Sequence, residues 1–191
     1  MIVTMDEATH VYTTDDGRQM PSVTRILEAT GIREPYRGDP AYGVRGTWCH
    51  RSTELVDIGD FDWSAAEAEH PDWIGFVRAY ERFRDDNRIE ILATEELVWS
   101  EMWWFAGTCD RRVLFNGQRT RLDFKTGRPG KSDVVQIALY DLTGEEAHDL
   151  LPVYLRSDGS YRAPPIPEEV QEEARAVGLA AARISRWTHR D

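Results

Sequence analysis

The clearest pattern of apolar and polar positions lies in residues 105–140, where two runs rich in apolar and β-branched residues flank Asn116-Gly117. An Asn-Gly pair between two such runs is typical of a hairpin with a two-residue type I′ turn. A loop of this length makes Phe115 face Gln118, and it therefore fixes the register of both strands. The pattern predicts a β-hairpin in the middle of this segment.

That register places two acidic residues opposite each other. Asp110 is expected to face Asp123, and Thr108 to face Lys125, because facing residue numbers have a constant sum in a hairpin. Side chains return to the same face of a strand at every second residue, so Asp110, Asp123 and Lys125 share a face. Two facing carboxylates repel each other unless a positive charge lies between them.

A hard divalent cation suits that position. Mg²⁺ accepts oxygen ligands from one or two carboxylates and completes its shell with water and substrate phosphate. The ammonium group of Lys125 is expected to stabilise or deprotonate a water there, an arrangement that favours hydrolysis of phosphodiester bonds. The plainer alternative for Asp123 and Lys125 is an exposed ion pair on one face of a polar strand.

The rest of the pattern predicts one α/β domain over residues 1–191, with a mixed central sheet flanked by helices. Within it, residues 1–88 hold an N-terminal hairpin and helices, residues 89–144 the central hairpin and its helix, and residues 145–191 a strand and the last helix. The expected elements are a hairpin at 10–20, a helix from Ser22 to Gly31, a helix from Asp39-Pro40 to Gly59, an acidic loop at 61–70, a helix at 71–87, one or two strands at 89–104, the central hairpin, a helix capped by Ser132 or Asp133 and ending near Gly144, a strand at 150–155 and a helix from Pro167 to Trp187.

Composition narrows the class of protein. The chain has 191 residues, 41% of them hydrophobic, which is enough for one domain with a full core. It contains no run of 18 apolar residues, and residues 1–10 lack the regions of a signal peptide, so we expect a cytoplasmic protein without membrane contact. Its two cysteines, Cys49 and Cys109, agree with a reducing compartment and lack the spacing of a zinc site.

Charge is unevenly distributed along the chain. The net charge is −11, but residues 111–131 contain seven basic residues and one acidic residue, so this segment carries +6 and the remainder −17. Such a strip would guide a phosphate backbone to one place while the other surfaces repel it. Arg111 is expected on the opposite face of the sheet and outside this contact. The residues expected to bind DNA are Arg112, Arg121, Arg128 and Lys131.

The helix after the hairpin carries Gln136 and Tyr140 one turn apart, which by itself is also typical of the edge of an amphipathic helix. The ordered motifs resemble the PD-(D/E)XK nuclease superfamily, and specifically its RecB-like branch, over about residues 20–155. The motifs are Gly107-x-x-Asp110, Asp123-Phe124-Lys125 and Gln136-x-x-x-Tyr140. The resemblance implies a restriction-endonuclease-like fold and a metal-dependent DNA nuclease, similar to exonucleases of phage or bacterial DNA recombination and repair.

The resemblance also implies a metal site for Mg²⁺ or Mn²⁺. In Arg45-Gly46-Thr47-Trp48-Cys49-His50 the glycine spacing resembles the motif whose helical histidine joins the aspartates, although a lone helical histidine is usually a surface or core residue. The ligands would be His50, Asp110, Asp123 and the backbone carbonyl of Phe124. Lys125 would then assist the attacking water, and Gln136 and Tyr140 would position the scissile strand.

Three acidic residues are candidates for the surroundings of that metal. Glu54, one turn after His50, either orients the imidazole or points to solvent. Glu95 resembles the acidic residue that many family members carry on the preceding strand, and Glu96 fits that place equally well. Part of this branch binds an iron–sulfur cluster through four cysteines, which two cysteines cannot hold.

Two other classes of function are compatible with the net charge of −11. One is a catalytically weakened nuclease fold that acts as a DNA-binding or assembly subunit. The other is an acidic protein-interaction module that mimics nucleic acid. Intact Asp110, Asp123 and Lys125 favour the enzyme, since a mimic needs no metal site. DNA is the expected partner, together with a second copy of the chain or a recombination partner protein. The last helix offers an apolar face for the core or such a partner: Val170, Ala174, Val177, Ala181 and Ile184.

Overall fold

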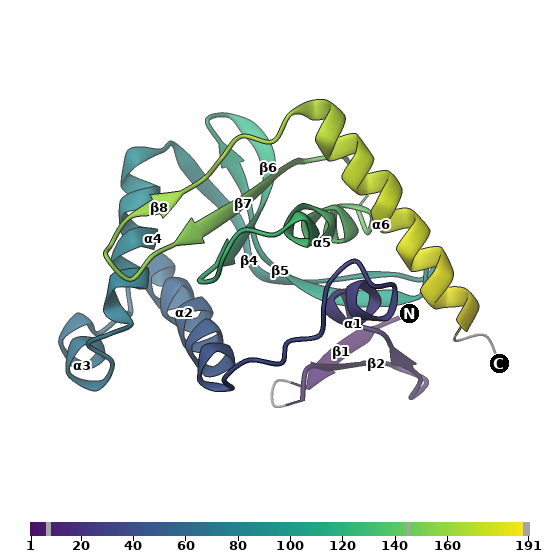
Figure 1. Ribbon diagram of the computed structural model, residues 1–191, viewed down its shortest axis with the longest axis horizontal. Helices are drawn as coiled ribbons and strands as arrows, with labels where there is room; N and C mark the ends of the chain where they lie inside the picture. The colour runs from purple at the N-terminus through teal and green to yellow at the C-terminus, as the bar shows by residue number, and fades with distance from the viewer. Residues whose placement is uncertain (7–8, 145, 189–191) are drawn as a thin grey trace.

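The computed structural model describes residues 1–6, 9–144 and 146–188. These residues form a single α/β domain with a mixed five-stranded sheet, a three-stranded sheet and six helices (Figure 1), as the sequence predicts in outline. In chain order the elements are β1 (Val3–Asp6), β2 (Val11–Thr14), β3 (Gln19–Met20), α1 (Val23–Ala29), α2 (Ala41–Ile58), α3 (Trp63–Glu69), α4 (Ile74–Asp86), β4 (Ile89–Ser100), β5 (Phe105–Phe115), β6 (Gln118–Lys125), α5 (Lys131–Asp141), β7 (Asp149–Leu155), β8 (Tyr161–Arg162) and α6 (Glu168–Thr188).

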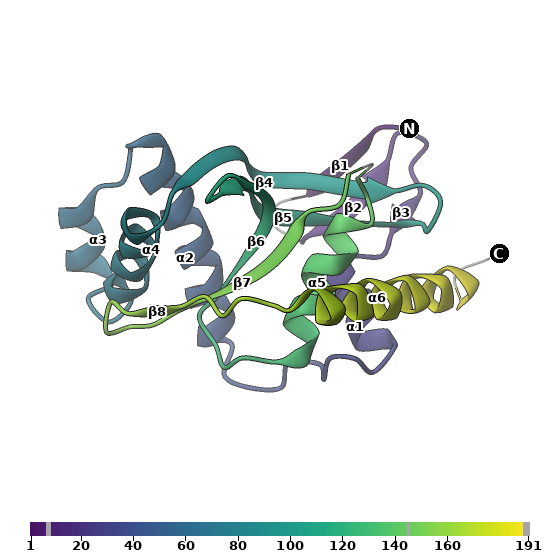
Figure 2. The ribbon, with the colours of Figure 1, turned by 90° about the horizontal axis from the view of Figure 1, so that it is seen from above.

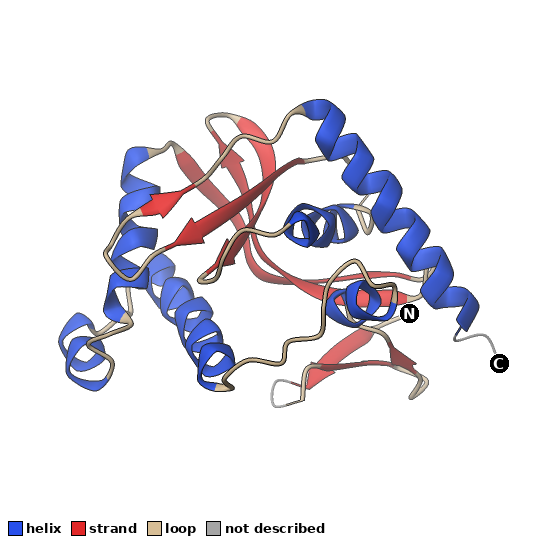
Figure 3. Cartoon of the chain, in the orientation of Figure 1, coloured by secondary structure: helices blue, strands red, loops and turns tan. Residues whose placement is uncertain are grey.

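The larger sheet has the strand order β4-β5-β6-β7-β8. The strands are drawn in red in Figure 3. Neighbouring strands are antiparallel except β6 and β7, which run parallel. A parallel pair needs a crossover connection, and helix α5 provides it. Only residues 126–130 separate the end of β6 from the start of α5, so the side chains of Asp123 and Lys125 lie close to this helix.

The hairpin predicted from Asn116-Gly117 is confirmed. Both residues have positive φ, 51° and 86°, as a type I′ turn requires. The paired residues run in the predicted register from Phe115 and Gln118 to Arg111 and Leu122. The ladder ends there, so the expected backbone pairs of Asp110 with Asp123 and of Thr108 with Lys125 are not formed.

Beyond the ladder a side chain joins the two strands. The backbone amide of Phe124 donates a hydrogen bond of 2.6 Å to Oδ2 of Asp110, across from β6 to β5. Thr108 shares a hydrogen bond of 3.1 Å with Tyr12 of the small sheet, away from Lys125. The hairpin therefore brings the two aspartates together without stacking them face to face.

Helices pack on both sides of the five-stranded sheet (Figure 2). Alternate residues of β7 separate the two cores, since Leu150 packs with α1, α5 and α6, whereas Leu151 and Val153 pack with α2 and α4. The side chains of Leu122 and Phe124 on β6 belong to the second core. Helices α2 and α5 therefore belong to the cores on opposite faces of the sheet.

Two local predictions are wrong. Residues 61–70, expected as a loop, contain helix α3, because the side chain of Asp62 accepts a hydrogen bond of 3.0 Å from the amide of Ala65 and caps the helix. Ser132 and Asp133, expected as caps, lie in the first turn of α5. Asp133 still holds that turn, since its carboxylate accepts a hydrogen bond of 2.8 Å from the amide of Gly130.

Other predicted boundaries agree with the structure. Ser22 caps α1 by accepting a hydrogen bond of 3.1 Å from the amide of Arg25. Helix α2 ends at Gly59, whose φ of 76° is a conformation that glycine adopts without strain. The N-terminal hairpin also forms, with strand β1 added to it to make the small sheet.

Helix α6 packs on α5 through one face and exposes another. Ala174 and Ala181 of its predicted apolar face are buried, but Val170, Val177 and Ile184 are exposed. The predicted partner subunit for this surface stays a prediction. Among the described residues, no helix combines the length and the apolar character that crossing a membrane requires.

Candidate metal centre and basic cleft

Three side chains with metal-ligating atoms meet beside the hairpin. They are His50 from α2, Glu95 from β4 and Asp110 from β5, and one ligand atom of each lies within 4.8 Å of the others. Nδ1 of His50 is 3.4 Å from Oδ2 of Asp110 and 3.9 Å from Oε1 of Glu95. One imidazole nitrogen and two carboxylate oxygens are a suitable donor set for a divalent cation. The three residues, called here the metal group, can hold a metal ion.

The electrostatics of the metal group fit a cation. Burial of Glu95 and the nearby charge of Asp110 together raise the pKa of the Glu95 carboxyl to about 7, against the opposing effects of His50 and Arg111. The ionised form of Glu95 is thus disfavoured, first by burial and then by the charge of Asp110. A divalent cation would offset both effects.

The backbone of β4 decides which of the two neighbouring glutamates joins the metal group. Glu95 has a φ of 46°, which side-chain-bearing residues rarely adopt and which costs about 1–3 kcal/mol. Its carboxylate faces His50 and Asp110, whereas the carboxylate of Glu96 accepts hydrogen bonds from Arg112. The structure thus separates two residues that the sequence could not, and it places Glu95 among the possible ligands.

Arg111 is buried, with 1% of its surface exposed, and it connects the metal group to α2. Its guanidinium lies 2.6 Å from Oδ2 of Asp57 and 3.2 Å from Oε1 of Glu95. It also donates a hydrogen bond of 3.2 Å to the hydroxyl of Thr53. Arg111 lies on the expected face of β5, opposite to Asp123, since its pair partner Leu122 belongs to the core under α2 and α4. Its long side chain nevertheless reaches the metal group through Glu95.

A second group of polar side chains lies on β6 and α5. Gln136 donates hydrogen bonds to Oδ1 of Asp123 (3.1 Å) and to the hydroxyl of Tyr140 (2.9 Å). Lys125 donates to Oε1 of Gln136 (3.0 Å) and forms an ion pair with Oδ2 of Asp123. The four residues that the sequence motifs indicate on β6 and α5 therefore form one connected set: Asp123, Lys125, Gln136 and Tyr140. Their roles in a reaction stay predictions.

Asp123 is not one of the three residues of the metal group. It is 1% exposed, and burial raises the pKa of its carboxyl to about 6, while Lys125 lowers it and the charge of Asp110 raises it further. Asp123 therefore lies within electrostatic reach of Asp110, with Lys125 as its direct partner. The expected ligand roles of Asp123 and of the Phe124 carbonyl stay predictions.

Gly107, the first residue of the predicted motif, has a packing role. A Cβ at this position would lie 2.7 Å from a ring carbon of Tyr140 and 3.0 Å from a methyl group of Val23. The ring of Tyr140 thus uses the space that a side chain would fill. Burial raises the pKa of Tyr140 well above its usual value, so its hydroxyl stays protonated beside Gln136.

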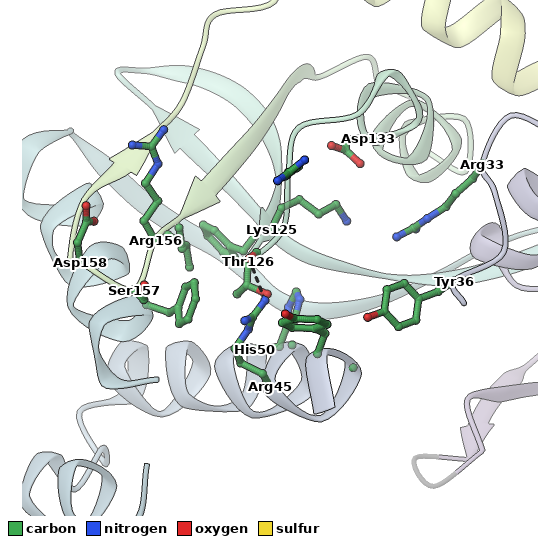
Figure 4. Close-up of a pocket in the computed structure, with 18 residues that line it drawn as sticks. Arg33, Tyr36, Arg45, His50, Lys125, Thr126, Asp133, Arg156, Ser157 and Asp158 are labelled. Carbon is green, nitrogen blue, oxygen red and sulfur yellow. Dashed lines mark hydrogen bonds between the residues drawn. The ribbon is translucent and has the colours of Figure 1, made fainter. Parts of the chain in front are cut away.

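A cleft of about 1090 Å³ opens beside both groups (Figure 4). His50 and Lys125 line it, so it reaches the metal group and the set around Gln136. Most of its lining comes from α2 with the loop before it, from the end of β6 with the loop that follows, and from the end of β7 with the turn to β8, and α4 and α5 add one residue each. Its charged lining residues, apart from His50, are Arg33, Arg45, Lys125, Arg128, Arg156, Asp133 and Asp158. The lining is therefore basic, although the protein as a whole is acidic.

Of the four residues expected to bind DNA, two are exposed and two form ion pairs inside the protein. Arg128 is exposed and lines the cleft, and Lys131 is exposed at the first residue of α5. Arg112 and Arg121 instead form ion pairs with Glu96. Arg121 is 3% exposed, so it cannot reach a DNA backbone in this fold, because acidic partners hold it inside.

Glu54, the third acidic candidate, does not join the metal group. It forms an ion pair with Arg51 on the same helix and makes no ion pair with His50 among the described residues.

Several cleft residues were not expected from the sequence. Arg33 and Tyr36 come from the loop 32–38, and Arg156 comes from the turn after β7. Neither segment carries a motif, and only the fold brings them to the same place. Arg45 belongs to the motif around His50, which was the one available signal for it.

No protein-family model matches this sequence, and no curated protein shows significant similarity to it.

Proposed function

We propose that this protein is a Mg²⁺- or Mn²⁺-dependent nuclease that hydrolyses phosphodiester bonds in DNA, and that it is a RecB-like member of the PD-(D/E)XK superfamily without an iron–sulfur cluster. The observation that carries the proposal is the metal group of His50, Glu95 and Asp110, which lies beside Asp123 and Lys125 and is reached from one basic cleft. The order of motifs in the sequence supports the family. The hydrogen bonds of Gln136 to Lys125 and Asp123 support a shared role of the last two motifs in one site.

A divalent cation bound here would polarise the scissile phosphate and lower the pKa of an attacking water. The protein's own groups would do the rest. Lys125, with 17% of its side chain exposed, can place its ammonium group beside a phosphate oxygen or the water when it leaves Asp123. Gln136 and Tyr140 would then hold Lys125 and Asp123 in position through their hydrogen bonds.

The cleft explains how an acidic protein would bind a polyanion. Arg33, Arg128 and Arg156 line it, and none of them forms an ion pair with an acidic residue in the described parts of the chain. Basic groups without acidic partners are available to neutralise phosphates. The net charge of −11 would repel DNA from the other surfaces and so favour this one orientation.

A cleavage assay tests the proposal. End-labelled linear DNA and covalently closed circular DNA are incubated with the protein in Mg²⁺, Mn²⁺ or chelator. Cleavage of linear DNA alone, dependent on metal, supports an exonuclease of the kind used in recombination or repair. Cleavage of the circle supports an endonuclease. The absence of any metal-dependent cleavage of either substrate overturns the proposal.

A second candidate is a nuclease fold that binds DNA or assembles with a partner without cutting. The ion pair of Lys125 with Asp123 favours it, since that pair holds both side chains away from a substrate. Salt-dependent DNA binding in the cleft without cleavage in Mg²⁺ or Mn²⁺ would establish this candidate instead.

A further inference from the structure

Two tyrosines stand exposed at the basic cleft. Tyr36, in the loop between α1 and α2, is 60% exposed, and Tyr42, in the first turn of α2, is 55% exposed. Both line the cleft (Figure 4 labels Tyr36). An aromatic ring stabilises the fold mainly when it is buried. Two exposed rings at one cleft therefore suggest a binding role for them.

The ring of Tyr36 is held in place although it is exposed. Its hydroxyl donates a hydrogen bond of 3.0 Å to the carbonyl oxygen of Asp39. Its ring lies against Gly38, where a Cβ would come within 2.6 Å of the ring carbon that bears the hydroxyl. A side chain fixed in this way loses little conformational entropy when a flat partner stacks on it.

The ring of Tyr42 is in contact with Arg45, although more than half of the residue is exposed. The guanidinium of Arg45 lies 4.8 Å from the centre of this ring and 4.8 Å from the centre of the Phe76 ring. Arg45 is itself fixed by a hydrogen bond of 3.1 Å to the carbonyl oxygen of Thr126 (Figure 4). This arrangement forms a layered stack that ends in the exposed Tyr42.

The cleft therefore combines basic and aromatic groups. The basic groups Arg33, Arg128 and Arg156 make no ion pairs within the described residues, whereas the two acidic residues of the lining accept hydrogen bonds from the protein itself. Asp133 accepts hydrogen bonds from Tyr154 and from the amide of Gly130, and Asp158 accepts from Ser160. A basic groove that also presents exposed aromatic rings is the combination by which proteins bind single-stranded nucleic acid.

We propose that Tyr36 and Tyr42 form a stacking platform for unpaired bases, so that the cleft takes single-stranded DNA. This inference rests on the proposed function, because it assigns a substrate class to the same cleft. In a duplex the faces of the bases are covered by their neighbours, and a tyrosine ring can reach only their edges or the terminal pair. In a single strand each base offers a face, and the flanking arginines can follow its phosphates.

Binding measured without cleavage tests the platform. Fluorescence anisotropy in Ca²⁺ or chelator compares three labelled probes: a single strand, the same sugar–phosphate strand without its bases, and a blunt duplex. For the single strand, Tyr36→Ala and Tyr42→Ala should each weaken binding by about 5- to 100-fold, the usual effect of removing one stacking ring. Tyr36→Phe should bind within about 3-fold of the parent, because the ring that stacks is kept.

The matched control is Trp187→Ala, which removes an aromatic ring that is 73% exposed on α6 and does not line the cleft. It should leave all three affinities unchanged. Circular dichroism of each variant checks that the fold is kept. On the abasic strand, the tyrosine variants should bind as the parent does, since only phosphate contacts remain.

Three results would overturn the platform: equal losses on intact and abasic strands, a parent protein that prefers the blunt duplex, or no loss in the tyrosine variants. The proposed nuclease activity is tested separately. Base-dependent binding of single strands without metal-dependent cleavage would support the platform and contradict the nuclease activity. Cleavage that is unaffected by Tyr36→Ala and Tyr42→Ala would support the nuclease activity and contradict the platform.

Discussion

Arg111 and Asp57 form a buried ion pair, with 2.6 Å between Nε and Oδ2, that joins strand β5 to helix α2. Because α2 carries His50 and β5 carries Asp110, this pair fixes the distance between two members of the metal group. Arg111→Ala would leave Asp57 buried, and in the described parts of the chain its remaining partners would be Arg84 and Tyr80. We expect a loss of about 3–5 kcal/mol in the free energy of unfolding, measured in urea.

The neighbouring residue provides the control for that experiment. Arg112 pairs with Glu96 near the surface, with 29% of the Arg112 side chain exposed. Arg112→Ala should therefore cost about 1 kcal/mol or less. Similar losses for both variants would contradict the assignment of Arg111 as the buried link.

Removal of the charge of Asp110 should abolish metal-dependent cleavage. Asparagine keeps an oxygen that can accept the hydrogen bond from the Phe124 amide, so Asp110→Asn tests charge without breaking that link. We expect cleavage to fall by more than about 100-fold, beyond the usual effect of residues that only support a ligand. The melting temperature in chelator should change little. Cleavage within a few-fold of the parent would remove Asp110 from the metal group.

The two adjacent glutamates should respond differently to the same substitution. Glu95→Gln removes a carboxylate from the metal group and should weaken Mn²⁺ binding by more than about 100-fold in calorimetry, beyond the effect of residues that only support a ligand. Glu96→Gln should leave Mn²⁺ affinity unchanged but lower the free energy of unfolding, because Glu96 pairs with the buried Arg121. An equal loss of Mn²⁺ affinity in Glu96→Gln would contradict the assignment of Glu95, and not Glu96, to the metal group.

Lys125→Arg should be nearly as inactive as Lys125→Ala. The guanidinium keeps the positive charge but is too large and planar for the space between Asp123 and Gln136, and it does not release a proton. Both variants should still bind DNA in Ca²⁺. Single-turnover cleavage is the measurement. Activity of Lys125→Arg close to that of the parent would leave Lys125 as a plain electrostatic contact of the phosphate.

The metal-free protein should lose stability as the pH rises from about 4.5 to about 7. Burial and Asp110 raise the pKa of Glu95 from 4.5 to about 7, so in this window the native state binds a proton that the unfolded chain releases. Stability falls with pH wherever the native state binds more protons. Urea unfolding in chelator measures the slope, and Glu95→Gln, which cannot titrate, should flatten it. An unchanged slope in that variant would show that Glu95 has no raised pKa.

Local patterns in the sequence predicted the parts of this site that lie on one hairpin and one helix. The Asn116-Gly117 turn set the register of β5 and β6, and the spacing of Gln136 and Tyr140 placed both on one face of α5. Pattern could not show where the ladder ends. That depends on the Asp110 side chain, which takes the Phe124 amide in place of a backbone partner.

Long-range contacts could not be predicted from the sequence for a different reason. Arg111 alternates with the site residues along β5, so period-two counting placed it on the far face. The fold covers that position with α2, and Asp57 pairs with Arg111 there. Likewise, the choice between Glu95 and Glu96 depends on one backbone angle, and helix α3 depends on one cap at Asp62.

The site is assembled from parts of the chain that are far apart, from His50 on α2 to Tyr140 on α5. Contacts between such distant residues form late in folding, because the chain between them must first be ordered. A nascent chain that has not yet produced α5 lacks Gln136, which donates a hydrogen bond to Asp123 in the folded domain. The complete arrangement therefore exists only in the finished fold, so any chemistry it performs is withheld until synthesis and folding of the domain are complete.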